Sequence, residues 1–555
     1  LIDTIKVGAT VDELLPTSGL LVLLAIVSLV FGAAAGITCS HASCGFAKNL
    51  RHDLFYKIQT FSFANIDDFS SSSLVTRLTT DITNVQQAFM MMIRIAVRSP
   101  LVLVFAFVMA FAMGGSVAMV YLVIIPILGF GLFYIIHLVR PIFSRVFHKY
   151  DALNESVEEN VSGMRVVKSF VREDYEKSKF ARAAQDVCAD FTRAEKLLAF
   201  NNPMMNICVN GAFVVIIYLG SKIIITTQGQ AFDIGQMSSI FTYGFQILMS
   251  LMQLSMIFVM VTMADESARR INEVLEATPT IKAPAEPIRE VADGSIDFDG
   301  VSFKYSARAE RQALSGIDLH IKSGETIGIM GGTGSAKSTL VNLIARLYDA
   351  TEGRVRVGGV DVRDYDLDTL RNQVAVVLQR NVLFSGTIKD NLRWGNQNAT
   401  DEELVEACRL AQADEFIQRF PQKYDTYIEQ GGTNVSGGQK QRLCIARALL
   451  KKPKVLILDD STSAVDTKTD KLIQQGFRSY IPETTKIIIA QRTSSIESCD
   501  RIVVMRDGQI DAIGTHDELL RTNDIYRETY TTQNKRSHDV KMSQMGEEQK
   551  EADHE

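Results

Sequence analysis

Four long stretches of this chain contain no Asp, Glu, Lys or Arg, and they restrict its fold more than any other feature. They cover Leu14–Ala47, Ser99–Val139, Leu197–Ser221 and Ile234–Met263. About 20 apolar residues are enough for a helix to cross a membrane. Helices of soluble proteins rarely run this far without a charge. The stretches therefore predict membrane-spanning helices rather than buried helices of a soluble domain.

The second stretch is long enough to cross a membrane twice. Gly114, Gly115 and Ser116 in its middle supply a turn, so the sequence predicts five membrane helices. The segments at 46–98 and 140–196 are long and rich in Lys and Arg. The positive-inside rule places these two segments in the cytosol.

Tracing the chain back from these cytosolic segments puts residues 1–13 outside the cell. The chain begins with Leu1, and no signal peptide pattern precedes the first apolar run. The simplest account is that one membrane helix upstream is absent from this sequence. A sixth crossing would return the N-terminus to the cytosol.

A stripe of methionines follows one face of the last predicted membrane helix. Met249, Met252, Met256, Met260 and Met263 recur at the three- and four-residue steps of a helical face. Methionine is flexible and polarizable, so this face could line a cavity for varied apolar ligands. Packing against other helices or lipid explains the stripe equally well.

Charge and cysteine spacing indicate which partners and cofactors this chain does not take. The formal net charge of the 555 residues is −6, and no dense block of Lys and Arg appears, which argues against nucleic acid as a partner. None of the seven cysteines forms a CxxC pair, so we interpret them as reduced and structural.

From about Ser295 the composition changes to that of a soluble α/β domain. A short apolar strand, Ile327–Met330, leads into a glycine-rich loop and then into an apolar helix from Leu340. This order wraps backbone N–H groups around a phosphate. The residues predicted to bind the nucleotide are Gly331, Gly332, Thr333, Gly334, Ser335, Ala336, Lys337, Ser338 and Thr339.

Two side chains of this loop have predicted roles toward ATP and Mg²⁺. Lys337 would reach the β- and γ-phosphates, and Ser338 would hold the metal. The G-x4-GK[ST] pattern alone is only moderately specific. Ala336 stands where the pattern commonly has its second glycine, so an extra Cβ lies beside the phosphates.

A second apolar strand, Val455–Leu458, ends in Asp459 and Asp460. Asp459 would hold Mg²⁺ through water at the end of a buried parallel strand. Taken alone, this segment could be an ordinary strand ending in an acidic loop. Its pairing with the phosphate loop favours the nucleotide site.

Between these elements lies a helix start made of small residues, Ser436, Gly437, Gly438 and Gln439. Such a start exposes N–H groups and the positive end of the helix dipole, which suits a phosphate. Together the three motifs resemble the nucleotide-binding domain of ABC transporters, in which SGGQ is the signature motif.

The resemblance implies further site residues. Tyr305 matches the aromatic residue that stacks on adenine, although it could also be a core residue of its strand. Gln379 matches the glutamine that senses Mg²⁺ and the γ-phosphate. Ser463–Asp466 resembles the D-loop that crosses the dimer interface, which puts Asp466 near the nucleotide.

The membrane half is similar to that of exporter-type ABC transporters, with six helices in each half and long intracellular helices. The resemblance implies an α-helical transmembrane domain fused to an α/β P-loop ATPase domain. Breaks at 70–78 and 160–167 would be coupling helices that dock on ATPase domains. The expected order is a transmembrane domain (1–266), a linker (267–294), the ATPase domain (295–530) and a polar tail (531–555) expected to be disordered.

Two catalytic positions depart from the family pattern. Active members have Glu directly after the aspartate of the second strand, as general base, whereas this chain has Asp460. A position that is normally His is Gln491, which cannot ionise near neutral pH. These two residues and Ala336 fall in one half-site, while the signature is intact.

In this family two ATPase domains pair head to tail, so each ATP lies between one chain's phosphate loop and the other's signature. The sequence thus resembles the degenerate-site subunit of heterodimeric bacterial multidrug exporters. We expect an unlike partner, a hydrophobic or amphipathic substrate carried out of the cell, and a location in the bacterial plasma membrane. A homodimeric exporter and a non-transporting, ATP-gated membrane regulator are the alternatives.

Overall fold

The computed structural model describes residues 11–228, 230, 232–306, 309–461 and 463–533. They divide into two compact units. The first comprises Leu1–Thr60 and Phe69–Ala277, and the second comprises Phe61–Asp68 and Thr278–Glu555. The two units correspond to the membrane half and the soluble half of the sequence.

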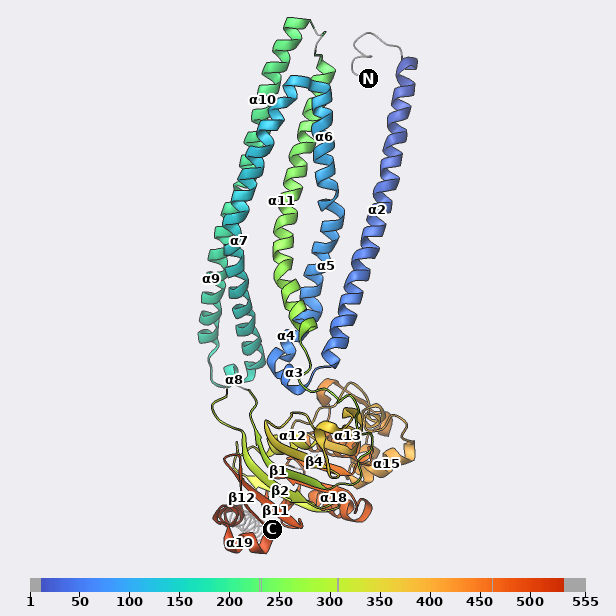
Figure 1. Ribbon diagram of the computed structural model, residues 1–555, viewed down its shortest axis with the longest axis vertical. Helices are drawn as coiled ribbons and strands as arrows, with labels where there is room; N and C mark the ends of the chain where they lie inside the picture. The colour runs from blue at the N-terminus through green and yellow to red at the C-terminus, as the bar shows by residue number, and fades with distance from the viewer. Residues whose placement is uncertain (1–10, 229, 231, 307–308, 462, 534–555) are drawn as a thin grey trace, which may run out of the picture. The chain divides into compact units, whose positions relative to one another are not determined.

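The first unit is built from helices, and Figure 1 shows α6 beside α11 and α7 beside α9 and α10. The helices are α2 (Val11–Gln59), α4 (Ser71–Thr76), α5 (Ile82–Met91), α6 (Arg98–Gly114), α7 (Met119–Ser162), α8 (Met164–Ser169), α9 (Glu173–Ala199), α10 (Asn201–Thr227) and α11 (Ile234–Glu276). Short turns join some of them: the π-helical η1 (Arg77–Asp81) and η2 (Met92–Ala96), and the 3₁₀-helical η3 (Gly115–Ala118).

Among the described residues, four helical stretches are long and apolar enough to cross a membrane: Leu14–Gln59, Ser71–Phe143, Glu173–Thr227 and Ile234–Glu276. The second contains α6 and the first part of α7, and the chain reverses direction between them where Gly115 adopts a φ of 49°. The predicted turn is therefore confirmed, and each of the five predicted crossings is helical. The helix expected upstream stays a prediction.

The predicted helix breaks are present in the first unit. The Ser70 hydroxyl accepts a hydrogen bond from the Ser73 backbone N–H at 3.4 Å and caps α4. The helix α4 is not isolated, however, because η1 continues it into α5. Gly163 separates α7 from the short helix α8.

The methionine stripe on α11 is only partly exposed. The side chains of Met249, Met252 and Met256 are exposed, and that of Met260 is half-buried. The side chain of Met263 lies outside the described part of the chain. Both interpretations of the stripe, cavity lining and packing, therefore stay open.

Two kinds of contact hold α11 in the first unit. In the apolar part, the buried Tyr121 hydroxyl of α7 donates to the Ile240 carbonyl at 2.9 Å. Nearer the end of α11, Arg270 donates to the buried Asp81 carboxylate at 2.7 Å, and the Ser267 hydroxyl donates to the same oxygen at 2.9 Å. Asp81 has no exposed surface, so its buried negative charge depends on Arg270 and Ser267 for stabilisation.

The second unit contains three sheets. Its strands are β1 (Ile296–Phe303), β2 (Leu314–Ile321), β3 (Thr326–Gly331), β4 (Glu352–Val357), β5 (Val360–Asp361), β6 (Val374–Val377), β7 (Gly386–Thr387), β8 (Tyr427–Ile428), β9 (Val455–Asp459), β10 (Thr485–Ile489), β11 (Arg501–Arg506) and β12 (Gln509–Gly514). The strand orders are β2-β1-β4-β5, β12-β11-β3-β10-β9-β6 and β7-β8.

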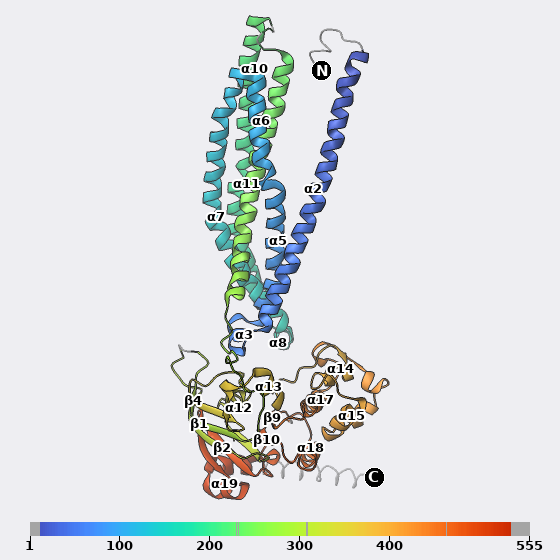
Figure 2. The same ribbon diagram turned by 45° about the vertical axis from the view of Figure 1, so that its right-hand side comes forward.

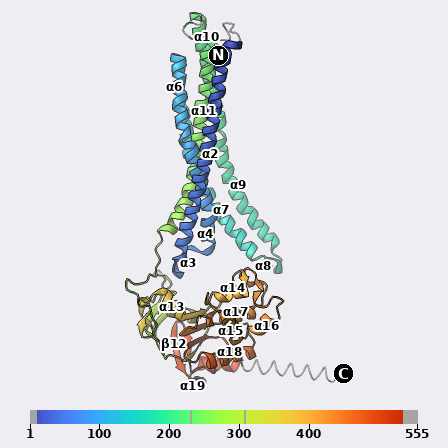
Figure 3. The same cartoon turned by 90° about the vertical axis from the view of Figure 1, so that its right-hand side faces the viewer.

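The helices of this unit are α3 (Phe63–Phe69), α12 (Lys337–Ile344), α13 (Leu367–Gln373), α14 (Ile388–Arg393), α15 (Asp401–Leu410), α16 (Asp414–Gln418), α17 (Gly437–Leu449), α18 (Thr467–Tyr480) and α19 (His516–Thr522). Figures 2 and 3 show α14, α15 and α17 gathered beside the strands. One apolar core lies between the four-stranded sheet, the six-stranded sheet and α12. A second lies between the six-stranded sheet and the helices α14, α15 and α17.

In the six-stranded sheet, β6, β9, β10, β3 and β11 run parallel. Their carboxyl ends therefore meet at one edge, where ligands bind in open α/β sheets. The phosphate loop follows β3, the two aspartates end β9, and Gln379 and Gln491 follow β6 and β10. The topology thus brings together motifs that are far apart in the sequence.

The helix α3 was missed in the sequence, and it belongs to the second unit. The Tyr348 hydroxyl donates to the Asp67 carboxylate at 2.7 Å, and the Asn65 amide donates to the Thr278 carbonyl at 3.2 Å. The Ser62 and Thr280 hydroxyls are 2.5 Å apart. This early segment is therefore anchored to the ATPase half by polar contacts.

Two helices run across the predicted boundaries, and the domain division itself stays a prediction. The helix α11 continues to Glu276, so residues 267–276 of the expected linker are helical. A helix covers residues 524–533 and passes the boundary expected at 530. The Gln533 side chain accepts from the Thr493 N–H at 2.9 Å and donates to the Gln491 carbonyl at 2.8 Å. The rest of the predicted tail lies outside the described residues.

Candidate functional site

The glycine-rich loop leaves the buried strand β3 and ends at the start of α12. Gly331 has a φ of 155°, and a Cβ there would lie 2.2 Å from the Met505 carbonyl oxygen, so only glycine fits. Ala336 adopts the left-handed conformation, with φ 67° and ψ 25°. For residues other than glycine this conformation costs about 1–2 kcal/mol, so the substitution recognised in the sequence carries real backbone strain.

The Lys337 ammonium bonds to the glycine-rich loop that precedes it. It donates to the Gly331 and Gly332 carbonyls at 2.9 Å each and to the Ser335 hydroxyl at 3.3 Å. Burial lowers the pKa of Lys337, while the nearby charges of Asp459 and Asp460 oppose that shift. The ammonium therefore sits among backbone carbonyls, next to two carboxylates.

The hydroxyl groups after Lys337 face two other predicted site residues. The Tyr305 and Thr339 hydroxyls are 2.9 Å apart, and Tyr305 is half exposed, with its ring edge-on to Tyr348 at 5.2 Å. Ser338 forms a side-chain hydrogen bond with Asp459. The predicted adenine residue and the predicted metal ligands thus meet at the first turn of α12.

Asp459 ends β9 and is almost completely buried. Burial raises the pKa of its carboxyl group, and the neighbouring charge of Asp460 acts in the same direction. The hydrogen bond with Ser338 and the charge of Lys337 oppose these effects. A buried carboxylate with a raised pKa is stabilised by an added cation, so these oxygens suit Mg²⁺.

Asp460 is held from two sides. The Gln491 amide donates to the Asp460 Oδ2 at 3.0 Å, and Gln379 forms a second side-chain hydrogen bond with Asp460. The backbone of Asp460 lies in the left-handed region, with φ 50°. Burial raises the pKa of its carboxyl group, while these hydrogen bonds and the charges of Lys337 and Arg492 lower it. The two departures from the family pattern are therefore in direct contact.

The signature residues begin α17 and form a capping box. The Ser436 hydroxyl accepts from the Gln439 N–H at 3.3 Å, and the Ser436 N–H donates to the Gln439 side chain at 2.9 Å. A Cβ on Gly438 would lie 2.8 Å from the Ala464 carbonyl oxygen. Gly437 is exposed. Within the described residues, no hydrogen bond joins these residues to the glycine-rich loop.

Two residues that the sequence reasoning missed connect the signature helix with the Asp460 region. The buried Gln441 side chain donates to the Ser463 hydroxyl at 3.2 Å and accepts from the Ala464 N–H at 3.0 Å. The Arg492 guanidinium, next to Gln491, donates to the Ser463 carbonyl at 3.0 Å. Their positions directly beside the two motifs were the only signal in the sequence.

Asp466 is the last residue of the loop at 463–466, to which Gln441 and Arg492 donate hydrogen bonds. Its carboxylate accepts from the Thr469 N–H at 2.9 Å and caps α18. This backbone hydrogen bond lowers the pKa of Asp466. The observed role is therefore to begin a helix, and its predicted contact with nucleotide stays a prediction.

The donor set fits ATP with Mg²⁺. A loop of backbone N–H groups and an ammonium supply positive charge, and a hydroxyl with a buried carboxylate supplies the oxygen ligands that Mg²⁺ prefers. The left-handed Ala336 keeps its N–H group and adds one Cβ to the loop. All of these groups lie at the carboxyl edge of the six-stranded sheet.

Comparison with known proteins gives the same class. Two family models match this chain, described as the ABC transporter transmembrane region, over residues 1–252, and the ABC transporter, over residues 314–463. An uncharacterized ABC transporter ATP-binding protein of Bacillus subtilis, YfiB, is 36% identical over 92% of this chain and 88% of its own length. The ATP-dependent lipid A-core flippase of Desulfotalea psychrophila is 32% identical over 88% of this chain and 84% of its own length.

The fold also matches a solved structure, that of a bacterial Atm1-family ABC exporter with ATP bound. The TM-score is 0.82 at 24% identity, covering 96% of this chain and 93% of that one. The chain belongs to the ABC transporter family. It is a multi-pass membrane protein with a C-terminal cytoplasmic ATPase domain, and ATP with Mg²⁺ is the ligand that this domain implies.

Proposed function

We propose that this chain is one half of a heterodimeric ABC exporter that moves hydrophobic or amphipathic compounds out of the cell. Its own ATP site turns over slowly, and its signature residues complete the partner's site. The observation that carries this proposal is the short Asp460 carboxylate, tied to the Gln491 amide at 3.0 Å. A carboxylate bound in this way is poorly placed to take a proton from water.

The residues of the site divide into binding and catalytic groups. When ATP enters, Lys337 would exchange its bonds with the loop carbonyls for phosphate oxygens, and Ser338 and Asp459 would hold Mg²⁺. Mg²⁺, when bound, would neutralise charge on the phosphates. Tyr305 offers an exposed ring to adenine. None of these binding groups is altered by the changes at Asp460 and Gln491, so the site binds ATP well and hydrolyses it slowly.

In a cycle driven by its partner, hydrogen bonds inside this chain would connect its signature helix with its own ATP site. Gln441 and Arg492 tie the loop at 463–466 both to the signature helix and to the strand end that carries Gln491. A change at one motif therefore shifts the other by short, direct hydrogen bonds. The helix α3 belongs to the ATPase half and follows α2 in the chain, so a shift of that half would move it.

The proposed substrate class rests on the relatives and on the exposed apolar membrane helices. One relative is described as an ATP-dependent lipid A-core flippase. The membrane helices of this chain carry many exposed apolar side chains. A hydrophobic or amphipathic substrate is the class that such surfaces accept.

The test is ATP turnover by the full-length chain, purified alone and with candidate partners. We expect little turnover alone, strong turnover with the partner, and no effect of Asp460→Asn on the latter. Strong turnover by a homodimer that Asp460→Asn abolishes would refute the proposal and favour the homodimeric exporter. ATP-driven uptake of an apolar dye by inside-out vesicles separates an exporter from a non-transporting regulator.

A further inference from the structure

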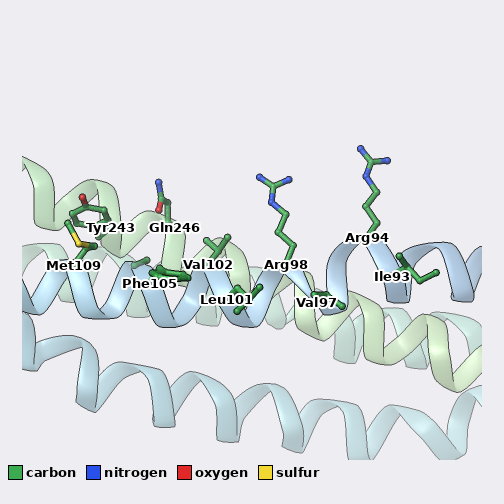
Figure 4. Close-up of a pocket in the computed structure, with 11 residues that line it drawn as sticks. Ile93, Arg94, Val97, Arg98, Leu101, Val102, Phe105, Met109, Tyr243 and Gln246 are labelled. Atoms are coloured by element: carbon green, nitrogen blue, oxygen red, sulfur yellow. The ribbon is translucent and has the colours of Figure 1, made fainter. Parts of the chain in front are cut away.

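An open groove lies between α6 and α11 in the first unit, on the side shown in Figure 4. Its volume is about 410 Å³, within the range of small-molecule sites. Most of its lining comes from one exposed apolar stripe, with a residue at every fourth position. The stripe consists of Ile93, Val97, Leu101, Phe105 and Met109.

One end of this groove is basic. Arg94 and Arg98 lie on consecutive turns, and Figure 4 shows both guanidinium groups projecting to the same side as the Gln246 amide of α11. No Asp or Glu is among the described residues that line the groove. Within the described part of the chain, neither guanidinium has a hydrogen-bond or ion-pair partner.

Two like charges four residues apart on a helix repel each other. A carboxylate, sulfate or phosphate group would neutralise both guanidinium groups, which bind such anions in a bidentate manner. The adjoining apolar stripe would hold a hydrocarbon body.

We propose that this groove binds the anionic head and apolar body of a transported amphiphile. The proposal rests on the export function proposed above and narrows its substrate class. From Arg94 to Met109 the groove extends about 22 Å, at 1.5 Å per helical residue, which accommodates an extended alkyl chain. Anionic amphiphiles bind best, neutral ones less well, and cationic ones are repelled by the paired charges.

A simpler role for these arginines is orientation, because Lys and Arg gather at the cytosolic ends of membrane spans. Arg140 is the matched control for that role. It is exposed and also borders a charge-free span, at the end of 99–139, but it does not line the groove. If the pair binds a ligand, only changes at Arg94 and Arg98 lower the affinity for that ligand. If the arginines orient the spans, a change at Arg140 acts in the same way as changes at Arg94 and Arg98.

The experiment measures binding of 11-(dansylamino)undecanoic acid and of its methyl ester to the full-length protein, co-purified with its partner in phosphatidylcholine nanodiscs without nucleotide. We expect the double variant Arg94→Gln, Arg98→Gln to weaken binding of the acid at least about tenfold. Binding of the ester should not change, and Arg140→Gln should leave both affinities intact. ATP-driven uptake of the acid into inside-out vesicles should fall with the double variant.

Several outcomes would overturn the proposal. Equal affinities for the acid and the ester would show that Arg94 and Arg98 only orient the spans. An equal loss of affinity for the acid in Arg140→Gln would show the same. Unchanged binding in the double variant would show that the groove is not the binding site of the acid. Displacement of the acid by phosphatidylglycerol, without any transport of the acid, would identify a site for membrane lipid. Because binding needs no hydrolysis, these results do not depend on which ATP site is active.

Discussion

Replacing Asp460 by Glu tests the proposed slow site directly. In the structure the Asp460 carboxylate accepts from the Gln491 amide at 3.0 Å and also bonds with Gln379. Glutamate adds one methylene group and extends the carboxylate by about 1.5 Å, the length of one C–C bond. The longer side chain reaches past the bond with Gln491 toward the position of an attacking water.

The expected gain follows from that distance. A misplacement of about 1 Å in a catalytic contact lowers a rate about 100-fold. Restoring the reach of the base should therefore raise hydrolysis at this site by up to about 100-fold, which is about 2.7 kcal/mol in the activation free energy. The affinity for ATP should stay within about twofold, since Lys337, Ser338 and Asp459 are untouched.

The assay is single-turnover hydrolysis of radiolabelled ATP by the full-length chain, measured alone and with its partner. Asp507→Glu is the matched control, because Asp507 is exposed, lies outside the site and shares the left-handed backbone, with φ 49°. Any loss of stability from placing Glu in that conformation should appear in both variants. Only Asp460→Glu should hydrolyse ATP faster.

A rate that rises less than about threefold in Asp460→Glu, with ATP affinity and stability preserved, would contradict this prediction. The length of the carboxylate would then not limit the site. If Gln491→His alone restored the rate, the missing imidazole would be the limiting group. In that case the hydrogen bond between Asp460 and Gln491 would not be what slows the site.

Three further predictions concern residues outside the catalytic pair. Asp81→Asn leaves the Arg270 guanidinium without its buried charge partner and should lower the free energy of unfolding by about 3–5 kcal/mol, whereas Asp174→Asn on the exposed face of α9 should change it little in denaturant titrations. Gln441→Ala removes two hydrogen bonds to the loop at 463–466 and should lower turnover with the partner at unchanged ATP affinity; a parallel loss of affinity would contradict this. Tyr348→Phe keeps the ring contacts but loses the bond to α3, so it should reduce vesicle uptake per ATP hydrolysed. Equal uptake per ATP would show that this bond carries no coupling.

Much of the candidate site could be predicted from the sequence because its motifs are local. The glycine-rich loop, the acidic strand end and the signature helix each need only consecutive residues to form. Gln441 and Arg492 could not be assigned in this way, because their partners at 463–465 are 20 residues or more away. The contact between Asp460 and Gln491 likewise arises only when β9 and β10 pair.

The membrane half shows the same division. Charge-free stretches and a double glycine were enough to predict the spans and the turn at Gly115, since a bilayer imposes length and apolarity on each helix separately. The helix α3 was missed because its apolar pattern is short. Its attachment to the ATPase half depends on Asp67 and Tyr348, which are 281 residues apart.

The class of protein, the order of its two halves and the two positions predicted to be altered follow from composition and from contiguous motifs. The contact between Asp460 and Gln491, and the position of α11 beside the basic pair and the apolar stripe, emerge in the fold. Parallel strand pairing and helix packing set which distant side chains meet, and neither is encoded in a single local pattern.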